Sequence, residues 1–286
     1  MMDPRTSEGI LQLVRSQGLN PYKPLGQHFL MSPEILNHIV ELLPAPRVEV
    51  LEIGPGPGGL TLALLEKGFK VLAIEVDRRW TKHLEDQLVC QFPDRLTVVE
   101  GDALAMDWAS LEGCDPPAPW DVVGNLPYYI TAPLLAKLAQ TRLSWRTAVV
   151  MVQKEVADRL STMPGARQTN ALGVILRYNA TVETVFQVDK TNFYPVPEVD
   201  SAVVRLVRKD PLPVSYEAFH WVVHAGFGHR RKMLRQALAQ SLRSPFSAQQ
   251  WASLLRGVGL DPTARAENLT IEEWVVLAQV FLGHTR

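Results

Sequence analysis

One stretch decides the fold of this 286-residue chain: Leu51-Glu52-Ile53-Gly54-Pro55-Gly56-Pro57-Gly58-Gly59-Leu60. Aliphatic residues run into a glycine-rich turn, and a helix-like pattern follows. Gly54, Gly56 and Gly59 match the spacing G-x-G-x-x-G, in which glycines let a ligand approach the backbone closely. Glu75 ends the next predicted strand, where a carboxylate can accept hydrogen bonds from both hydroxyls of a ribose. The pattern therefore predicts an adenosine-containing ligand.

The glycine spacing alone leaves two kinds of cofactor open. A nicotinamide dinucleotide fits it as well as any other adenosine compound. However, Pro55 and Pro57 remove backbone N–H donors that a pyrophosphate would use, and Glu52 adds a negative charge just before the turn. A sulfonium cofactor carries an ammonium group and no phosphate, so these residues favour it.

Outward from this turn, strand-like and helix-like segments alternate. Short aliphatic runs predict strands at 48–53, 71–76, 96–100, 121–124 and 147–152, with helices at 59–67, 78–90, 131–140 and 154–161. This alternation predicts an α/β fold whose mostly parallel sheet is covered by helices on both faces.

The two ends of the chain have a different pattern. Residues 7–17 predict a short amphipathic helix. A proline-containing linker at 209–213 precedes segments of helical periodicity near 216–227, 231–243, 247–257 and 270–282. We therefore expect a first domain at 1–208, including an N-terminal extension, and a small all-α domain at 209–286.

The turn Asn125-Leu126-Pro127-Tyr128 follows the fourth predicted strand and is typical of a pocket for a base. The side-chain oxygen of Asn125 and the carbonyl of Leu126 can accept the hydrogens of an adenine amino group, which makes its nitrogen more nucleophilic. Pro127 has no N–H to compete and restricts the backbone. Tyr128 offers a ring for stacking, worth roughly 1–3 kcal/mol per base.

Two further residues are candidates for the same site. Asp102 follows the third predicted strand, at the sheet edge where Gly54 and Glu75 lie, and can accept a hydrogen bond from the amine of a cofactor adenine. Its alternative role is that of an N-cap for the next helix. Phe193 can close the other face of a flipped base opposite Tyr128; its alternative role is to anchor the loop.

Composition excludes several classes of protein. A hydrophobic content of 47% with 21% charged residues is typical of a globular chain. No apolar run approaches the roughly 20 residues of a membrane span, and the N-terminus lacks an apolar leader. Cys90 and Cys114 alone provide neither a disulfide framework nor a zinc site. We expect a cytosolic, metal-free protein.

Charge is unevenly distributed, although the formal net charge is only −1. From Arg205 to Arg243 there are eight basic residues and two acidic ones, so this stretch carries a charge of +6. A local positive field attracts phosphates. The alternative is an ordinary solvated helix face.

Taken together, five segments resemble the KsgA/RsmA family of ribosomal RNA adenine dimethyltransferases, over nearly the whole chain. They are Lys23–Leu30, Leu51–Gly59, Asn125–Tyr128, Pro195–Val204 and Ala225–Lys232. The first three are shared with the related Erm enzymes of the large subunit. Leu126, the basic run Arg230–Lys232 and the segment Arg265–Asn268 favour KsgA.

This resemblance implies a Rossmann-like class I methyltransferase with a seven-stranded sheet, joined to a helical RNA-binding domain. It implies S-adenosylmethionine-dependent N6,N6-dimethylation of two adjacent adenosines in the 3′-terminal hairpin loop of small-subunit (16S) rRNA, on an immature subunit. We expect a monomer. The implied cofactor contacts are His28, Leu30, Gly54, Gly56, Glu75, Asp102 and Asn125; the catalytic residues Asn125, Leu126, Pro127, Tyr128 and Phe193; and the RNA contacts Arg230, Arg231, Lys232 and Arg235.

The sequence departs from the family pattern at two positions. His28 stands where the family usually has Asn, and Glu198 stands where it usually has a basic residue. Four other functions stay open on the residues alone: an Erm-like enzyme, a DNA adenine methyltransferase, a nicotinamide-dependent oxidoreductase, and a noncatalytic assembly factor.

Overall fold

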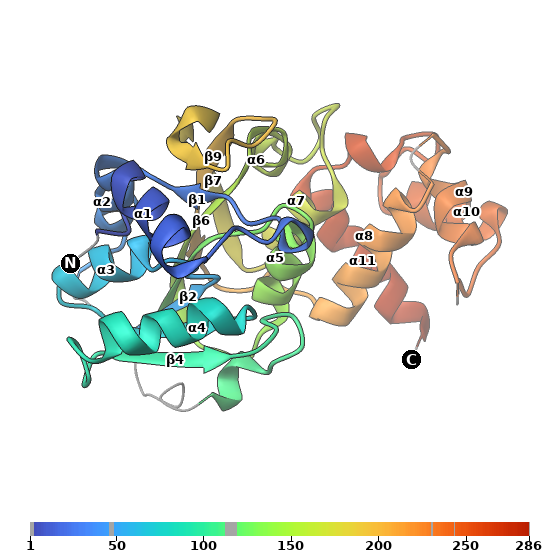
Figure 1. Ribbon diagram of the computed structural model, residues 1–286. Coiled ribbons are helices and arrows are strands. Elements are labelled where there is room, and N and C mark those ends of the chain that lie inside the picture. Colours follow the sequence, from blue (N-terminus) through green and yellow to red (C-terminus); the bar gives the residue numbers. More distant parts are fainter. Residues whose placement is uncertain (1–2, 46–48, 112–118, 230, 243, 286) are drawn as a thin grey trace. The chain divides into compact units, whose positions relative to one another are not determined.

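A computed structural model describes residues 3–45, 49–111, 119–229, 231–242 and 244–285 (Figure 1). The chain divides into two compact units. The first unit consists of Met1–Ala157 and Glu183–Arg208, and the second of Asp158–Val182 and Lys209–Arg286. One division thus falls at the expected linker. The segment Asp158–Val182 differs from the expectation, because it belongs with the C-terminal helices.

The first unit is built on a seven-stranded sheet with the order β4-β3-β2-β5-β6-β9-β7. The strands are β2 (Glu49–Ile53), β3 (Lys70–Glu75), β4 (Leu96–Glu100), β5 (Trp120–Asn125), β6 (Trp145–Gln153), β7 (Ala180–Val188) and β9 (Ser201–Arg208). Strands β2 to β6 pair in parallel, whereas β9 pairs with β6 antiparallel. The predicted mostly parallel α/β sheet is confirmed.

The central strands are buried on both faces. In β2 every residue from Val50 to Ile53 is buried, and in β5 every residue from Trp120 to Gly124. Such strands form where helices cover both sides of a parallel sheet. The chain runs outward from β2 to β3 and β4, and then returns to place β5 on the other side of β2. At such a reversal, ligands bind beyond the carboxyl ends of the strands.

Helices precede and connect the strands, and some of them begin at a capping side chain. They are α1 (Ser7–Gln17), α2 (Pro33–Glu41), α3 (Gly59–Glu66), α4 (Arg78–Leu84), α5 (Thr131–Gln140) and α6 (Lys154–Ser161), with a π-helical turn at Glu85–Val89 after α4. In α2 the Ser32 side chain accepts a hydrogen bond from the Ile35 N–H, and Pro33 is the first helical residue.

A two-stranded sheet joins distant parts of the first unit. Strand β1 (Phe29–Leu30) pairs antiparallel with β8 (Phe193–Tyr194), and Leu30 lies opposite Phe193. Neither strand is predicted from the sequence. Their pairing holds Pro195, in the loop after β8, beside His28.

The second unit is helical. Its helices are α7 (Ala171–Leu176), α8 (Tyr216–Phe227), α9 (Leu234–Gln240), α10 (Ala248–Gly257) and α11 (Ile271–Thr285). Helices α8 and α11 approach closely at Gly226, because glycine has no side chain. A Cβ at this position would lie only 2.6 Å from the Trp274 ring. Trp221 and Phe281 stack between the same helices, with ring centroids 4.1 Å apart. None of the described helices is long and apolar enough to cross a bilayer.

Candidate active site

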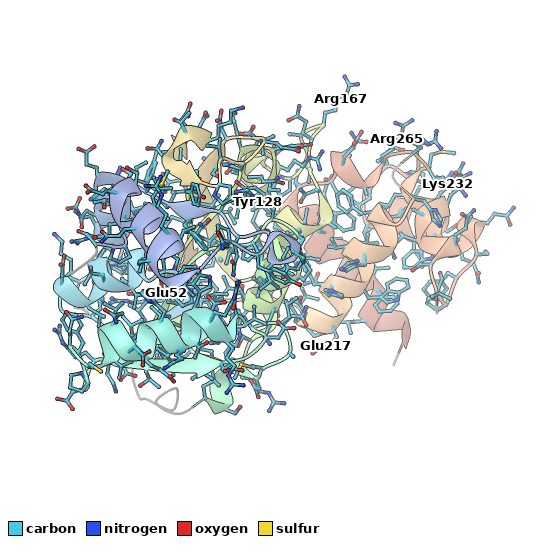
Figure 2. All side chains as sticks on the ribbon, viewed as in Figure 1. Glu52, Tyr128, Arg167, Glu217, Lys232 and Arg265 are labelled. Atoms are coloured by element: carbon cyan, nitrogen blue, oxygen red, sulfur yellow. The ribbon has the colours of Figure 1, made fainter. Side chains whose placement is uncertain are left out.

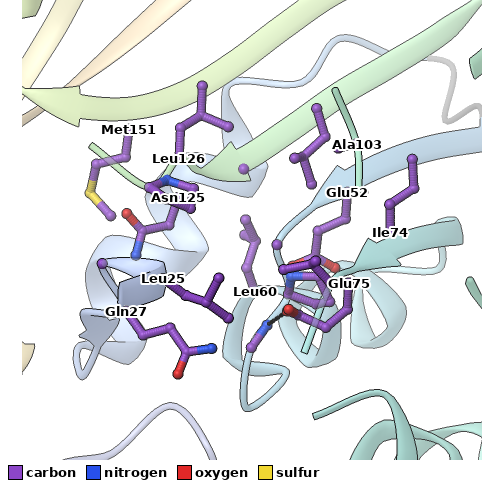
Figure 3. A pocket seen from close by; sticks show the side chains of 18 of the residues that line it. Leu25, Gln27, Glu52, Leu60, Ile74, Glu75, Ala103, Asn125, Leu126 and Met151 are labelled. Atoms are coloured by element: carbon purple, nitrogen blue, oxygen red, sulfur yellow. Dashed lines mark hydrogen bonds between the residues drawn. The ribbon is translucent and has the colours of Figure 1, made fainter. Parts of the chain in front are cut away.

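A cavity of about 460 Å³ lies in the first unit, at the carboxyl edge of β2, β3, β4 and β5 (Figure 3). All the predicted cofactor residues line it: His28, Leu30, Gly54, Gly56, Glu75, Asp102 and Asn125. The rest of the predicted base turn, Leu126, Pro127 and Tyr128, lines it too. Segments that are far apart in the sequence therefore meet at one site.

The glycine turn and Glu75 form a wall held by backbone hydrogen bonds. Gly54 and Gly56 have φ values of 69° and 53°, a region that disfavours side-chain-bearing residues. The Gly56 N–H donates to one carboxylate oxygen of Glu75 at 3.0 Å, and the Asp77 N–H donates to the other at 2.9 Å. Each oxygen keeps a further lone pair. Glu75 is thus oriented before any ligand binds. We call Gly54, Gly56 and Glu75 the cofactor wall.

Behind this wall lies a second carboxylate, Glu52, which is only 1% exposed. Its Oε2 atom has no hydrogen-bond partner within the described residues. Burial, reinforced by the negative charge of Glu75, raises the pKa of Glu52 to about 8. A buried acceptor without a hydrogen-bond partner is energetically costly. A cationic ligand group beside Glu52 would provide that partner. Figure 3 shows Glu52 and Glu75 side by side.

Asp102 caps a turn rather than a helix, and it also lines the cavity. Its Oδ1 atom accepts the Leu104 N–H at 2.8 Å, and its carbonyl accepts the N–H groups of Ala105 and Met106. It therefore caps the turn that follows β4. The same residue lines the cavity and is exposed, so its carboxylate remains accessible to a ligand.

The amide of Asn125, at the end of β5, has a defined orientation. Its Nδ2 donates to the His28 carbonyl at 2.8 Å. A carbonyl can only accept, so the nitrogen must face His28 and the oxygen Oδ1 is left as an acceptor at the cavity. The Leu126 carbonyl has no partner among the described residues either. The turn thus presents two acceptors, as the sequence predicts.

Tyr128 is fixed at both ends. Its hydroxyl lies 3.1 Å from the Ser201 Oγ, and burial raises its pKa. His28 stacks on its ring, with centroids 5.6 Å apart and planes inclined by 23°. The Nδ1–H of His28 donates to the Pro195 carbonyl at 2.7 Å, which fixes the tautomer of the imidazole.

Phe193 is not brought to the site in the expected way. It is 1% exposed, belongs to the hydrophobic core and does not line the cavity. The reason is the β1–β8 pairing, because successive residues of a strand point to opposite faces and Phe193 takes the inner one. In this structure the ring beside Tyr128 is that of His28.

Two lining residues with polar groups are not among the residues expected at the site from the sequence. Glu52 is expected there only as a charge before the glycine turn, although its place in a strand of aliphatic residues signals a buried carboxylate. Tyr129, which is 56% exposed, lines the cavity and lies against Gly26. Burial and the charges of Asp102 and Glu75 raise its pKa. Tyr129 follows the recognised turn directly, but nothing in its pattern indicates the cavity.

The predicted RNA contacts lie in the second unit. Arg231 and Lys232 are exposed, whereas Arg235 is partly buried and contacts the Met233 sulfur. Figure 2 shows Lys232 at the outside of this unit. Arg230, Arg243 and Cys114 lie outside the described residues. The remainder of the chain contains no group of three or more His, Cys, Asp or Glu side chains that could hold a metal ion.

Known proteins match this chain over almost its whole length. A model of the family described as ribosomal RNA adenine dimethylase matches residues 19–282. The chain is 38% identical to ribosomal RNA small subunit methyltransferase A of Pelotomaculum thermopropionicum, covering 96% of this chain and 95% of that protein. It is 37% identical to the protein of the same name from Bacillus cytotoxicus, covering 99% of each.

Two solved structures share the fold. A dimethyladenosine transferase from Plasmodium falciparum superposes with a TM-score of 0.73 at 25% identity, covering 89% of this chain and 97% of that one. The 23S rRNA methyltransferase ErmE superposes with a TM-score of 0.66 at 27% identity, covering 88% and 98%. The chain belongs to the ribosomal RNA adenine dimethylases, enzymes that transfer methyl groups from S-adenosylmethionine to adenine N6 in ribosomal RNA.

Proposed function

We propose that this enzyme dimethylates two adjacent adenosines in the 3′-terminal hairpin loop of small-subunit (16S) rRNA, acting as a cytoplasmic monomer on an immature subunit. Relatives at 37–38% identity are named for the small subunit, whereas ErmE, named for 23S rRNA, is 27% identical. This difference in identity favours the small subunit as substrate.

For the cofactor, we assign the cofactor wall together with His28, Leu30, Asp102 and Asn125. When bound, S-adenosylmethionine supplies a sulfonium-activated methyl group. The free lone pairs of Glu75 accept hydrogen bonds from ribose hydroxyls, and Asp102 accepts one from the adenine amine. Glu52 is protonated in the free protein near neutral pH, and a bound cationic group favours its ionised form. Proline in place of two N–H donors in the glycine turn is consistent with a ligand that lacks phosphate.

For the target base, one observation carries the proposal: the hydrogen bond from Asn125 to the His28 carbonyl leaves Oδ1 as an acceptor at the cavity. Asn125 Oδ1 and the Leu126 carbonyl hold the two N6 hydrogens, while Pro127 restricts the turn and Tyr128 stacks on the base. Holding reactants in line contributes up to roughly 7–11 kcal/mol. No strong base is required, because the methylated ammonium loses its proton to water. The core position of Phe193 leaves its proposed contact with the base dependent on a rearrangement.

For the rRNA, we assign the second unit, through Arg230, Arg231, Lys232 and Arg235. Exposed basic side chains bind the backbone and shape of RNA, which positions the substrate without reading its sequence. The loop that contains Glu198 does not add to this positive charge, because position 198 carries an acidic residue. Substrate choice then depends on which loop the bound rRNA presents to the cavity.

The experiment is methyl transfer from labelled S-adenosylmethionine to three substrates: undermethylated small subunits, large subunits and duplex DNA. We expect label only in small subunits, on adenosines that nuclease digestion identifies as N6,N6-dimethylated neighbours. Asn125→Ala is the control that removes the acceptor. Label in large subunits would show an Erm-like enzyme, and label in DNA would show a DNA adenine methyltransferase. A protein that binds the small subunit but transfers no label would be a noncatalytic assembly factor.

A further inference from the structure

The loop Gly101–Asp107 forms one side of the cavity without being part of a helix or strand. Gly101, Asp102, Ala103 and Leu104 all line the cavity. Inside the loop, Asp102 accepts the N–H groups of the following residues, as described above. The loop carbonyls need partners from elsewhere, because unpaired buried backbone groups are costly.

Two side chains provide these partners. Lys137, from α5, donates from Nζ to the Leu104 carbonyl at 2.8 Å and also to the Met106 carbonyl. Trp108 donates from its indole N–H to the Ala103 carbonyl at 2.8 Å. The Lys137 ammonium also lies 5.2 Å from the centre of the Trp108 ring, within the range of a cation–π interaction.

This placement is electrostatically costly for a lysine. Burial lowers the pKa of Lys137, and the nearby charges of Asp107 and Asp102 oppose that effect. The hydrogen bonds of the ammonium nevertheless go to backbone carbonyls of the loop. An ammonium has three donors in a compact group, so it can hold two carbonyls at once.

The position of Lys137 links the two sides of the cavity. Helix α5 begins at Thr131, directly after the Asn125–Tyr128 turn. Lys137 therefore ties the helix that follows the base turn to the loop that carries Asp102. Without this tie, the loop around Asp102 keeps only its own short turns and the hydrogen bond from Trp108 to the Ala103 carbonyl.

We propose that Lys137 is a positioning residue for cofactor binding: by holding the Leu104 and Met106 carbonyls, it fixes the loop that presents Asp102. This inference rests on the proposed contact of Asp102 with the cofactor. Lys137 does not touch the cofactor itself. Its loss weakens the cofactor complex and leaves the methyl-transfer step at saturating cofactor nearly unchanged.

The test compares Lys137→Met, which keeps the length of the side chain without its donors, with Lys137→Arg, which keeps the charge. We expect Lys137→Met to raise the Kd and the KM for S-adenosylmethionine about tenfold, because two partly buried carbonyls lose their donor. We expect kcat to stay within about twofold and Lys137→Arg to restore most of the affinity. Lys67→Met, which changes an exposed lysine directly after the last residue of α3, is the matched control.

Asp102→Asn separates failure of this inference from failure of the cofactor assignment. If Lys137 positions Asp102, the double variant loses little more affinity than either single variant. An unchanged Kd in Lys137→Met beside a raised Kd in Asp102→Asn would overturn the role of Lys137 alone. An unchanged Kd in Asp102→Asn would overturn the assignment of Asp102. A Lys137→Met protein that loses kcat and thermal stability with unchanged KM would show a merely structural role.

Discussion

The cofactor wall, which we propose holds the cofactor, and the basic segment Arg231–Arg235, which we propose holds rRNA, are built in opposite ways. Glu75 is 4% exposed and receives two backbone N–H groups. In contrast, Arg231 and Lys232 are exposed side chains at the surface of the helical unit. In a preorganised, desolvated site, the loss of a single hydrogen-bonding atom removes most of the function. Each exposed charge, in contrast, contributes only a small amount to the binding free energy, and salt screens it. Each prediction below tests this difference.

The largest effect is expected for Asn125→Ala. Removal of a fixed acceptor that binds the reacting amine should lower kcat about 10²–10³-fold, by analogy with loss of one preorganised hydrogen-bonding group. Single-turnover methyl transfer to small subunits measures it. Asn20→Ala, an exposed amide in the loop after α1, is the control and should keep the full rate. A fully active Asn125→Ala protein would contradict the role of the turn.

Next is Glu75→Gln, which exchanges one acceptor oxygen for an NH2 group facing a backbone N–H. The mismatch and the lost charge should raise the Kd for S-adenosylmethionine about 10–100-fold. Calorimetric titration measures this. Glu100→Gln removes an exposed carboxylate at the end of the neighbouring strand and should leave the Kd unchanged. Equal affinities in the two variants would refute the assignment of Glu75.

A pH-dependent effect is expected for Glu52, whose pKa burial raises from 4.5 to about 8. Between these values the folded protein keeps a proton that the unfolded chain releases, so the free energy of unfolding falls as pH rises. The stability that the protonated Glu52 contributes is fully present below pH 4.5, and it is lost as the pH rises from 4.5 to about 8. Glu52→Gln cannot ionise, and should therefore become more stable relative to the unmodified protein as pH rises through this window.

Denaturant unfolding of both proteins at several pH values measures this difference. The comparison must be made without cofactor, because a bound cation would favour the ionised carboxylate. A stability difference that stays constant from pH 4.5 to 8 would show that Glu52 is already ionised in the folded protein.

The smallest effects are expected for Arg231→Ala and Lys232→Ala. Each should weaken rRNA binding only a few-fold and reduce the slope of log affinity against log salt by about one. Binding of a small-subunit rRNA fragment at several salt concentrations measures this. Lys82→Ala, an exposed lysine on α4, should leave the slope unchanged. If one of these single variants abolished rRNA binding, the basic segment would be a preorganised site and the contrast with the cofactor wall would be wrong.

Much of the α/β order follows from local sequence pattern. The glycine turn and the aliphatic runs around it are signals within a few residues, and the structure confirms the elements they predict. Strands β7 and β9 and the β1–β8 pair were not predicted, because their pairing joins segments far apart in the chain. The place of Asp158–Val182 in the helical unit depends likewise on long-range packing.

The candidate site shows the same limit. Each lining segment has its own motif, so the predicted residues around the cavity come together as expected. The inward direction of Phe193 depends on strand register, which a one-residue shift reverses. The stacking of His28 on Tyr128 and the reach of Lys137 to the loop are contacts between separate segments. No pattern within one segment indicates them.

The most direct test of the central claim is a crystal structure of the enzyme with S-adenosylhomocysteine and an adenosine-containing fragment of the small-subunit hairpin. We expect adenine N6 within about 3 Å of Asn125 Oδ1, the Asn125 Nδ2 still bonded to the His28 carbonyl, and the cofactor ribose on Glu75. An adenine bound elsewhere, or an Asn125 oxygen turned away from the base, would contradict the account.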